Sequence, residues 1–133
     1  ELSAYPEVPE VLDRLRAEGR RTAILSNADP AMLEAAVASA GIGERLDACL
    51  SVESVGVFKP DPRTYGLVTE TFGVARREVL FVSSNGWDAW AATAFGFRTV
   101  WVNRRGEPLD RLTVAPDRVV ADLSPVPDIA AGL

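Results

Sequence analysis

The sequence predicts an α/β fold, in which a mostly parallel sheet is covered by helices on both faces. Short apolar runs alternate along the chain with segments whose apolar residues recur at helical spacing. This alternation is typical of βαβ units and therefore of a parallel sheet. The chain has 133 residues and shows no long linker and no internal repeat. We therefore expect one domain over residues 1–133.

The predicted helices are recognised by their first and last residues. An aspartate followed by a proline supplies a cap and a first-turn residue, and this pair occurs at Asp29 and at Asp61. A glycine, which ends helices readily, follows each apolar helical segment. The predicted helices cover residues 7–18, 29–41, 61–73 and 87–95, and the tail from Ser124 forms at most a short helix.

The predicted strands are the apolar runs between these helices. The run that ends at Ser83 is the clearest of them, and Cys49 lies inside another, where we expect it to be a core residue. A polar loop over residues 104–108 separates the last two candidates. The predicted strands cover residues 22–26, 48–55, 79–83, 99–103 and 118–121.

The composition excludes several classes of function. The net charge is −5 with scattered acidic residues, which argues against a nucleic-acid partner, because such binding needs a basic face. No run of 18 apolar residues occurs, so no membrane span is expected. The single cysteine, Cys49, allows no intrachain disulfide and favours a cytoplasmic protein. The absence of histidine excludes a histidine base or metal ligand.

Polar side chains follow three of the predicted strands at the points where the strands end. Ser26 and Asn27 follow the first, Lys59 comes after the second, and Ser83, Asn85 and Asp88 follow the third. Each set has a simpler explanation: the serines and asparagines as turns or caps, Asp88 as an acid at a helix start, and Lys59 as a surface lysine. Their coincidence at the carboxyl ends of parallel strands, where ligands bind in open α/β sheets, favours one shared site.

These segments resemble the haloacid dehalogenase superfamily, and within it the type II L-2-haloacid dehalogenases. The resemblance covers nearly the whole chain, and its most specific part is the run from Ser83 to Asp88. It implies the Rossmann-like core of that superfamily and the hydrolysis of L-2-haloalkanoic acids to D-2-hydroxy acids through an aspartyl ester. The segments that carry it are Leu25–Asn27, Val57–Pro62, Leu80–Asp88 and Phe95–Phe97.

The resemblance also implies a role for each site residue. Lys59 would hold the nucleophile, with support from Tyr65 and Ser83, and Asp88 would position Lys59. Asn85 would share with Asp88 the placing of the hydrolytic water. On the substrate side, Ser26 would bind the carboxylate, Asn27 would line the halide side, and Trp87 would form the wall of the apolar pocket. The resemblance implies a homodimer, and it implies neither a cofactor nor a metal.

The nucleophile itself is not found in the sequence. The family carries it in an Asp-x-Tyr-Gly-Thr type of motif on a first strand, followed by a helical cap domain, and neither segment occurs here. We therefore interpret the chain as a C-terminal core portion of the enzyme, inactive alone. In the family that first strand lies between the strands ending at Ser26 and at Ser83. We expect the empty position to be filled by the missing N-terminal segment or by a strand from a second copy, unless the two flanking strands pair directly.

Two other functions remain open from the sequence. A small-molecule phosphatase of the same superfamily would need Mg²⁺ and at least two carboxylate ligands, whereas Asp88 is the one acid in the main motif. A non-catalytic α/β binding module would use the same residues merely as caps and turns. The residues encoded before Glu1 would discriminate, since Asp-x-Tyr-Gly supports a dehalogenase and Asp-x-Asp a phosphatase.

Overall fold

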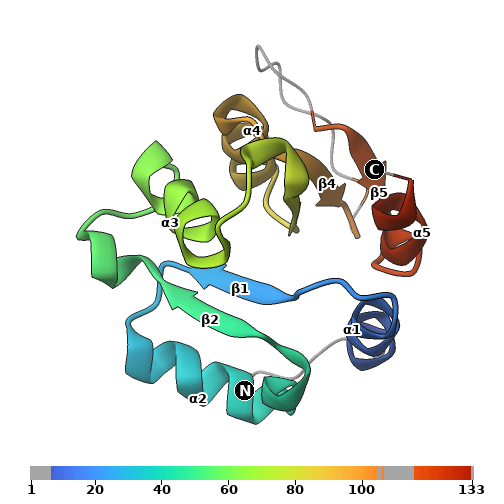
Figure 1. Ribbon diagram of the computed structural model, residues 1–133, viewed down its shortest axis with the longest axis horizontal. Helices are drawn as coiled ribbons and strands as arrows, with labels where there is room; N and C mark the ends of the chain where they lie inside the picture. Colours follow the sequence, from blue (N-terminus) through green and yellow to red (C-terminus); the bar gives the residue numbers. More distant parts are fainter. Residues whose placement is uncertain (1–6, 105, 107–115, 133) are drawn as a thin grey trace.

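The computed structural model describes residues 7–104, 106 and 116–132, and in them helices and strands alternate as predicted (Figure 1). The helices are α1 (Val8–Ala17), α2 (Pro30–Ala40), α3 (Pro62–Phe72), α4 (Gly86–Phe95) and α5 (Val126–Ala131). The strands are β1 (Ala23–Ser26), β2 (Ala48–Ser51), β3 (Leu80–Ser83), β4 (Arg98–Val102) and β5 (Arg118–Val120). Short 3₁₀ helices occur at η1 (Gly43–Arg45), η2 (Val52–Val55) and η3 (Arg76–Glu78).

All pairings between the described strands are parallel, as predicted. They form two separate sheets, with the strand order β1–β2 in one and β3–β4–β5 in the other. β1 and β3 therefore do not pair with each other. The alternative in which the strands ending at Ser26 and Ser83 close up and pair directly is wrong for this structure.

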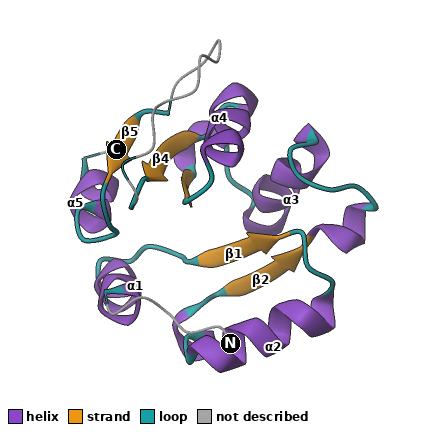
Figure 2. Ribbon diagram, turned by 180° about the vertical axis from the view of Figure 1, so that it is seen from behind, coloured by secondary structure: helices purple, strands orange, loops and turns teal. Residues whose placement is uncertain are grey.

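Helices cover both faces of the strands, which confirms the predicted architecture (Figure 2). One face is covered by α1, α2 and α5, and α1 contacts both sheets. Val11 of α1 packs with Val100 and Val102 of β4, while Leu12 of α1 packs against the cluster that contains Leu33 of α2. The other face is covered by α3 and α4, whose core cluster includes Tyr65, Ala91, Ala92 and Phe97.

The predicted strand 48–55 is wrong in its second half. β2 ends at Ser51, and residues 52–55 turn into η2 instead. The Ser51 hydroxyl oxygen accepts the Glu53 N–H at 3.2 Å and so caps this turn. Gly56 ends it with φ of +74°, a conformation that suits glycine. The apolar residues Val52 and Val55 thus belong to a turn, which the run of residues alone does not reveal.

Cys49 is exposed, so its expected place in the core is also wrong. Among the described strands β2 pairs with β1 alone and forms the edge of its sheet. A side chain at such an edge can remain uncovered although its strand is apolar. The predicted polar loop 104–108 falls largely outside the described residues. In the described part of the chain, no helix has the length and apolar character needed to cross a bilayer.

Candidate active site

The centre of the candidate site is an ion pair between Lys59 and Asp88. Lys59 lies in the loop between η2 and α3, and Asp88 lies in the first turn of α4, directly after β3. The Lys59 Nζ lies 2.8 Å from Asp88 Oδ2, and the side chains retain 12% and 2% exposure. The structure thus brings together two residues that are 29 positions apart in sequence, as the strand-end argument predicted.

Two hydroxyl groups hold the Asp88 carboxylate from the protein side. The Ser83 Oγ donates to Oδ2 at 3.0 Å, and the Tyr65 hydroxyl donates to Oδ1 at 2.6 Å. Burial raises the pKa of the Tyr65 phenol well above its usual range, and its bond to Asp88 and the charge of that carboxylate raise it further. Tyr65 is therefore a neutral donor at ordinary pH, and the predicted group of Lys59, Tyr65, Ser83 and Asp88 forms one connected network.

Lys59 is held at both ends by β1 and the turn that follows it. Its Nζ donates to the Leu25 carbonyl oxygen at 3.3 Å, and its main-chain N–H donates to Asn27 Oδ1 at 2.8 Å. The ammonium group also lies over the ring of Phe81, 5.7 Å from the centroid, a distance compatible with a cation–π contact. Sequence reasoning missed Leu25, because it acts through its main chain. It also missed Phe81, whose only signal was its place in β3, two residues before Ser83.

The other predicted side chains lie near this network without joining it. The Ser26 Oγ accepts the Ala28 N–H at 3.1 Å, as a turn-forming serine does. The Asn85 main-chain N–H donates to Ser83 Oγ at 3.1 Å, while its side chain makes no capping bond to α4. Trp87 is 44% exposed. Among the described residues, no hydrogen bond links the side chains of Ser26, Asn85 and Trp87 to Lys59 or Asp88.

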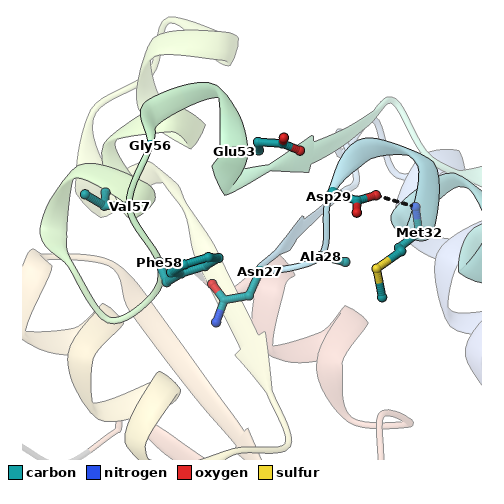
Figure 3. A pocket seen from close by; sticks show the side chains of 8 residues that line it. All are labelled: Asn27, Ala28, Asp29, Met32, Glu53, Gly56, Val57 and Phe58. Carbon is teal, nitrogen blue, oxygen red and sulfur yellow. Dashed lines mark hydrogen bonds between the residues drawn. The ribbon is translucent and has the colours of Figure 1, made fainter.

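An open pocket lies beside the site, between the turn after β1 and η2 (Figure 3). Figure 3 shows the Asn27 side chain next to Phe58, the residue before Lys59. Met32 and Phe58 are 63% and 67% exposed, so the pocket has an apolar rim. Lys59 and Asp88 are not part of its lining, which consists of Asn27, Ala28, Asp29, Met32, Glu53, Gly56, Val57 and Phe58.

The chemistry available to this site is the handling of negative charge. A buried lysine with fixed partners can hold a carboxylate or another anion without reorganising, which is how preorganised charge stabilises reacting groups. The carboxylates needed for a hard cation are not gathered here. Within residues 7–104, 106 and 116–132, no three side chains of the histidine, cysteine, aspartate and glutamate types come together in a way that could hold a metal ion.

The parallel α/β core thus carries a buried lysine–aspartate pair at the carboxyl ends of its strands. The sequence profile of the haloacid dehalogenase-like hydrolases matches residues 1–96, and the chain belongs to that family. It is similar to the (S)-2-haloacid dehalogenase of Pseudomonas sp. strain YL, with 42% identity over 128 residues that cover 96% of this chain and 55% of the relative. The chain thus spans about half the length of this relative.

Solved structures show the same relationship. A crystal structure of an L-2-haloacid dehalogenase superposes with a TM-score of 0.94 at 46% identity, over 97% of this chain and 57% of that protein. A phosphatase of the same superfamily from Thermococcus onnurineus superposes with a TM-score of 0.82 at 25% identity, over 97% of this chain and 59% of that one. The fold is shared by both kinds of enzyme, whereas the sequence is more similar to the dehalogenase.

Proposed function

We propose that this chain carries the lysine–aspartate centre of an L-2-haloacid dehalogenase, which hydrolyses L-2-haloalkanoic acids to D-2-hydroxy acids. The observation that carries the proposal is a hydrogen-bond donor of the Lys59 ammonium group that has no acceptor among the described residues. An ammonium group has three donors, and among the described residues Lys59 uses two of them, to Leu25 and Asp88. The third is available at the carboxyl ends of the strands for an acceptor that the described residues do not supply.

That acceptor, in our proposal, is the carboxylate of an aspartate outside this chain. This carboxylate attacks C2 of the haloacid, the carbon–halogen bond breaks, and halide leaves with inversion at C2. Water then attacks the carbonyl carbon of the aspartyl ester, the acyl–oxygen bond breaks, and the 2-hydroxy acid departs. One proton of the water is released, and the carboxylate is regenerated. Lys59 balances the carboxylate charge in both steps, and Asp88 keeps Lys59 in place.

The remaining predicted residues serve the substrate in this proposal. Ser26 is suited to bind the substrate carboxylate, because its hydroxyl accepts the Ala28 N–H but has no acceptor for its own proton among the described residues. Asn27 contributes its amide nitrogen on the halide side. The side chain of Asn85 positions water, and Trp87, which is partly exposed, forms a wall of the apolar pocket.

We further propose that an extended segment of the same protein inserts between β1 and β3. The two sheets are separate, and in the described residues the edges of β1 and β3 that face away from their partners have no strand beside them. An inserted parallel strand would satisfy these backbone groups, each of which costs about 1–3 kcal/mol when buried unpaired. Its carboxyl end would also lie near Lys59, where the proposal needs a carboxylate.

The function is tested on the full-length protein with L- and D-2-chloropropionate, by measuring chloride release and the chirality of the lactate formed. We expect chloride and D-lactate from the L enantiomer alone. Residues 1–133 alone should release no chloride, and addition of the N-terminal segment should restore some release. Chloride release by 1–133 alone would show that the nucleophile lies within this chain.

The phosphatase alternative is separated by metal dependence. We propose a metal-independent enzyme, so treatment with EDTA should leave chloride release unchanged. A phosphatase would instead hydrolyse p-nitrophenyl phosphate, lose this activity in EDTA and regain it with Mg²⁺. Such behaviour together with no chloride release would replace the dehalogenase proposal.

The cellular location and the assembly are also proposals. A single cysteine and no intrachain disulfide support a cytoplasmic location. We propose a homodimer by similarity to the family, and light scattering of the full-length protein would test it by giving the mass of two copies or of one.

A further inference from the structure

The strands β1, β2 and β3 end in the same way, on a serine that forms a turn. The hydroxyl oxygens of Ser26, Ser51 and Ser83 each accept the main-chain N–H two residues ahead, at 3.1, 3.2 and 3.1 Å. The serines differ in where the hydroxyl proton goes. Ser83 donates to Asp88, and Ser26 has no acceptor among the described residues. Ser51, which ends β2 and was not predicted as a site residue, donates to the Ala28 carbonyl oxygen at 2.7 Å.

Ser51 thereby joins the two turns that follow β1 and β2. It lies opposite Ser26 in the parallel register, so its side chain is placed beside the end of β1. Its hydroxyl oxygen accepts the Glu53 N–H in the η2 turn, and its hydroxyl donates to the Ala28 carbonyl oxygen in the turn after β1. A half-buried hydroxyl that uses both its donor and an acceptor in this way restrains the distance between the two turns.

The turn after β1 in turn holds Lys59. Asn27, the residue before Ala28, accepts the Lys59 main-chain N–H, and Leu25 accepts the Lys59 Nζ. Asn27 itself is exposed, and Figure 3 shows its side chain beside Phe58 with no other side chain of the pocket packed around it. The Ser51–Ala28 bond restrains the main chain one residue from Asn27, and so the position from which the Asn27 side chain reaches Lys59.

We propose that Ser51 is a positioning residue, which holds the turn after β1 so that Asn27 keeps the main chain of Lys59 in place. The consequence for turnover rests on the proposed function of Lys59, but the restraint on the Lys59 main chain does not. Ser51 acts through Ala28 and Asn27 and touches neither the ion pair nor the substrate. The two parts can therefore be tested by separate measurements on the same variants.

The test uses Ser51→Ala and Ser51→Thr in the full-length protein, with Ser54→Ala as the matched control. Ser54 lies in the same turn and donates to the Ser51 carbonyl oxygen at 3.1 Å, but it has no bond to the turn after β1. We expect hydrogen exchange at the Lys59 amide, followed by NMR, to become up to about tenfold faster in Ser51→Ala. Ser51→Thr should restore the wild-type rate, and Ser54→Ala should retain it.

Activity gives the second measurement. Ser51→Ala should lower kcat for L-2-chloropropionate about tenfold with a smaller change in KM, because a displaced lysine impairs the chemical step. Asn27→Ala should speed exchange at Lys59 by itself, and adding Ser51→Ala to it should change that rate little further.

Unchanged exchange at Lys59 in Ser51→Ala would overturn the proposal, as would an equal effect of Ser54→Ala. If Ser51→Ala does not fold, Ser51→Cys keeps the size of the side chain and weakens the bond. Unchanged exchange at Lys59 in Ser51→Cys, or an equal effect of Ser54→Ala, would then overturn the proposal. Faster exchange at Lys59 in a protein whose wild type releases no chloride would support the positioning role and contradict the proposed function.

Discussion

Aspartates hold both ends of the strands, yet they do so with different partners. At the amino ends, Asp47 accepts the Thr22 N–H at 2.7 Å, and Asp117 accepts the Thr99 N–H at 2.8 Å. Each of these aspartates stands one residue before a strand, β2 or β5, and binds a residue at the start of the neighbouring strand. At the carboxyl ends, Asp88 instead binds a lysine ammonium and two side-chain hydroxyls.

The carboxylates at the two ends therefore differ in their burial and in the charge of their partners. Asp47 and Asp117 are exposed, and each accepts a threonine main-chain N–H. Asp47 also lies 3.6 Å from Arg16 in an ion pair that stays open to solvent, so both aspartates align adjacent strands without burying a charge. Asp88 is buried against Lys59, and the removal of both charges from water offsets much of their attraction. A pair of this kind contributes little to stability by comparison with apolar residues of the same size. The anion-handling role proposed for Lys59 gives this buried pair a function that stability alone does not.

The largest difference between the two ends of the strands is expected at Lys59. In the full-length protein, Lys59→Ala should lower kcat for L-2-chloropropionate by about 100- to 1,000-fold, because it removes a fixed charge at the reacting carboxylate. The fold should persist with an unfolding free energy lowered by about 3–5 kcal/mol, because Asp88 then stays buried without its cation and keeps only its two hydroxyl donors. Asp88→Ala should lower kcat similarly. Circular dichroism and chloride release measured on the same preparation test this, and activity within a few-fold of wild type would contradict the role of Lys59.

Tyr65 should make the stability of the protein depend on pH. Its phenol has a pKa raised in the folded protein by burial and by Asp88, so above about pH 10 the unfolded chain loses a proton that the folded protein retains. This contribution to stability is complete below about pH 10 and is lost as the pH rises. Tyr65→Phe should lower the unfolding free energy by about 1.5–3 kcal/mol at pH 8, since a bond to a charged acceptor is removed.

The pH dependence provides the control for this variant. Between pH 9 and 11 the stability difference between wild type and Tyr65→Phe should shrink, as measured by urea unfolding at each pH. A difference that stays constant over this range would show that Tyr65 ionises equally easily in both states.

At the amino ends of the strands, a substitution should lower stability and leave activity nearly unchanged. Asp117→Ala removes the acceptor for the Thr99 N–H and should lower the unfolding free energy by about 1–2 kcal/mol. Chloride release by the full-length protein should stay within about twofold, because this aspartate lies at the other end of the strands from Lys59. A large loss of kcat with unchanged stability would show that the amino ends of the strands also affect turnover.

Cys49 should give the smallest effect. Because the side chain is exposed, Cys49→Ser should change the unfolding free energy by no more than about 0.5 kcal/mol and leave chloride release unchanged. Thermal unfolding and activity measurements check this. An unfolding free energy lowered by several kcal/mol would show that Cys49 packs in the core, as the sequence suggested.

The order of the elements, and the strand ends at which the polar side chains gather, could be predicted from the sequence. Apolar spacing, the Asp–Pro pairs and the glycines identify the helices, since these are local properties of the backbone. The run from Ser83 to Asp88, the lysine at 59 and the turn at Ser26 identified the polar strand ends. The resemblance to the family grouped Lys59, Tyr65, Ser83 and Asp88 and gave Tyr65 and Ser83 as support for Lys59, whereas their hydroxyls bind Asp88 in the structure.

Features that depend on contacts between distant segments could not be predicted from the sequence and are visible only in the folded structure. It separated β1 from β3 and left Cys49 exposed, because burial depends on which elements cover a strand and not on the strand's own residues. It also assigned the Leu25 carbonyl to Lys59 and Ser51 to Ala28. Main-chain acceptors leave no trace in residue identity, and a serine that ends a strand looks the same whether its proton goes to a turn, to a carboxylate or to a ligand.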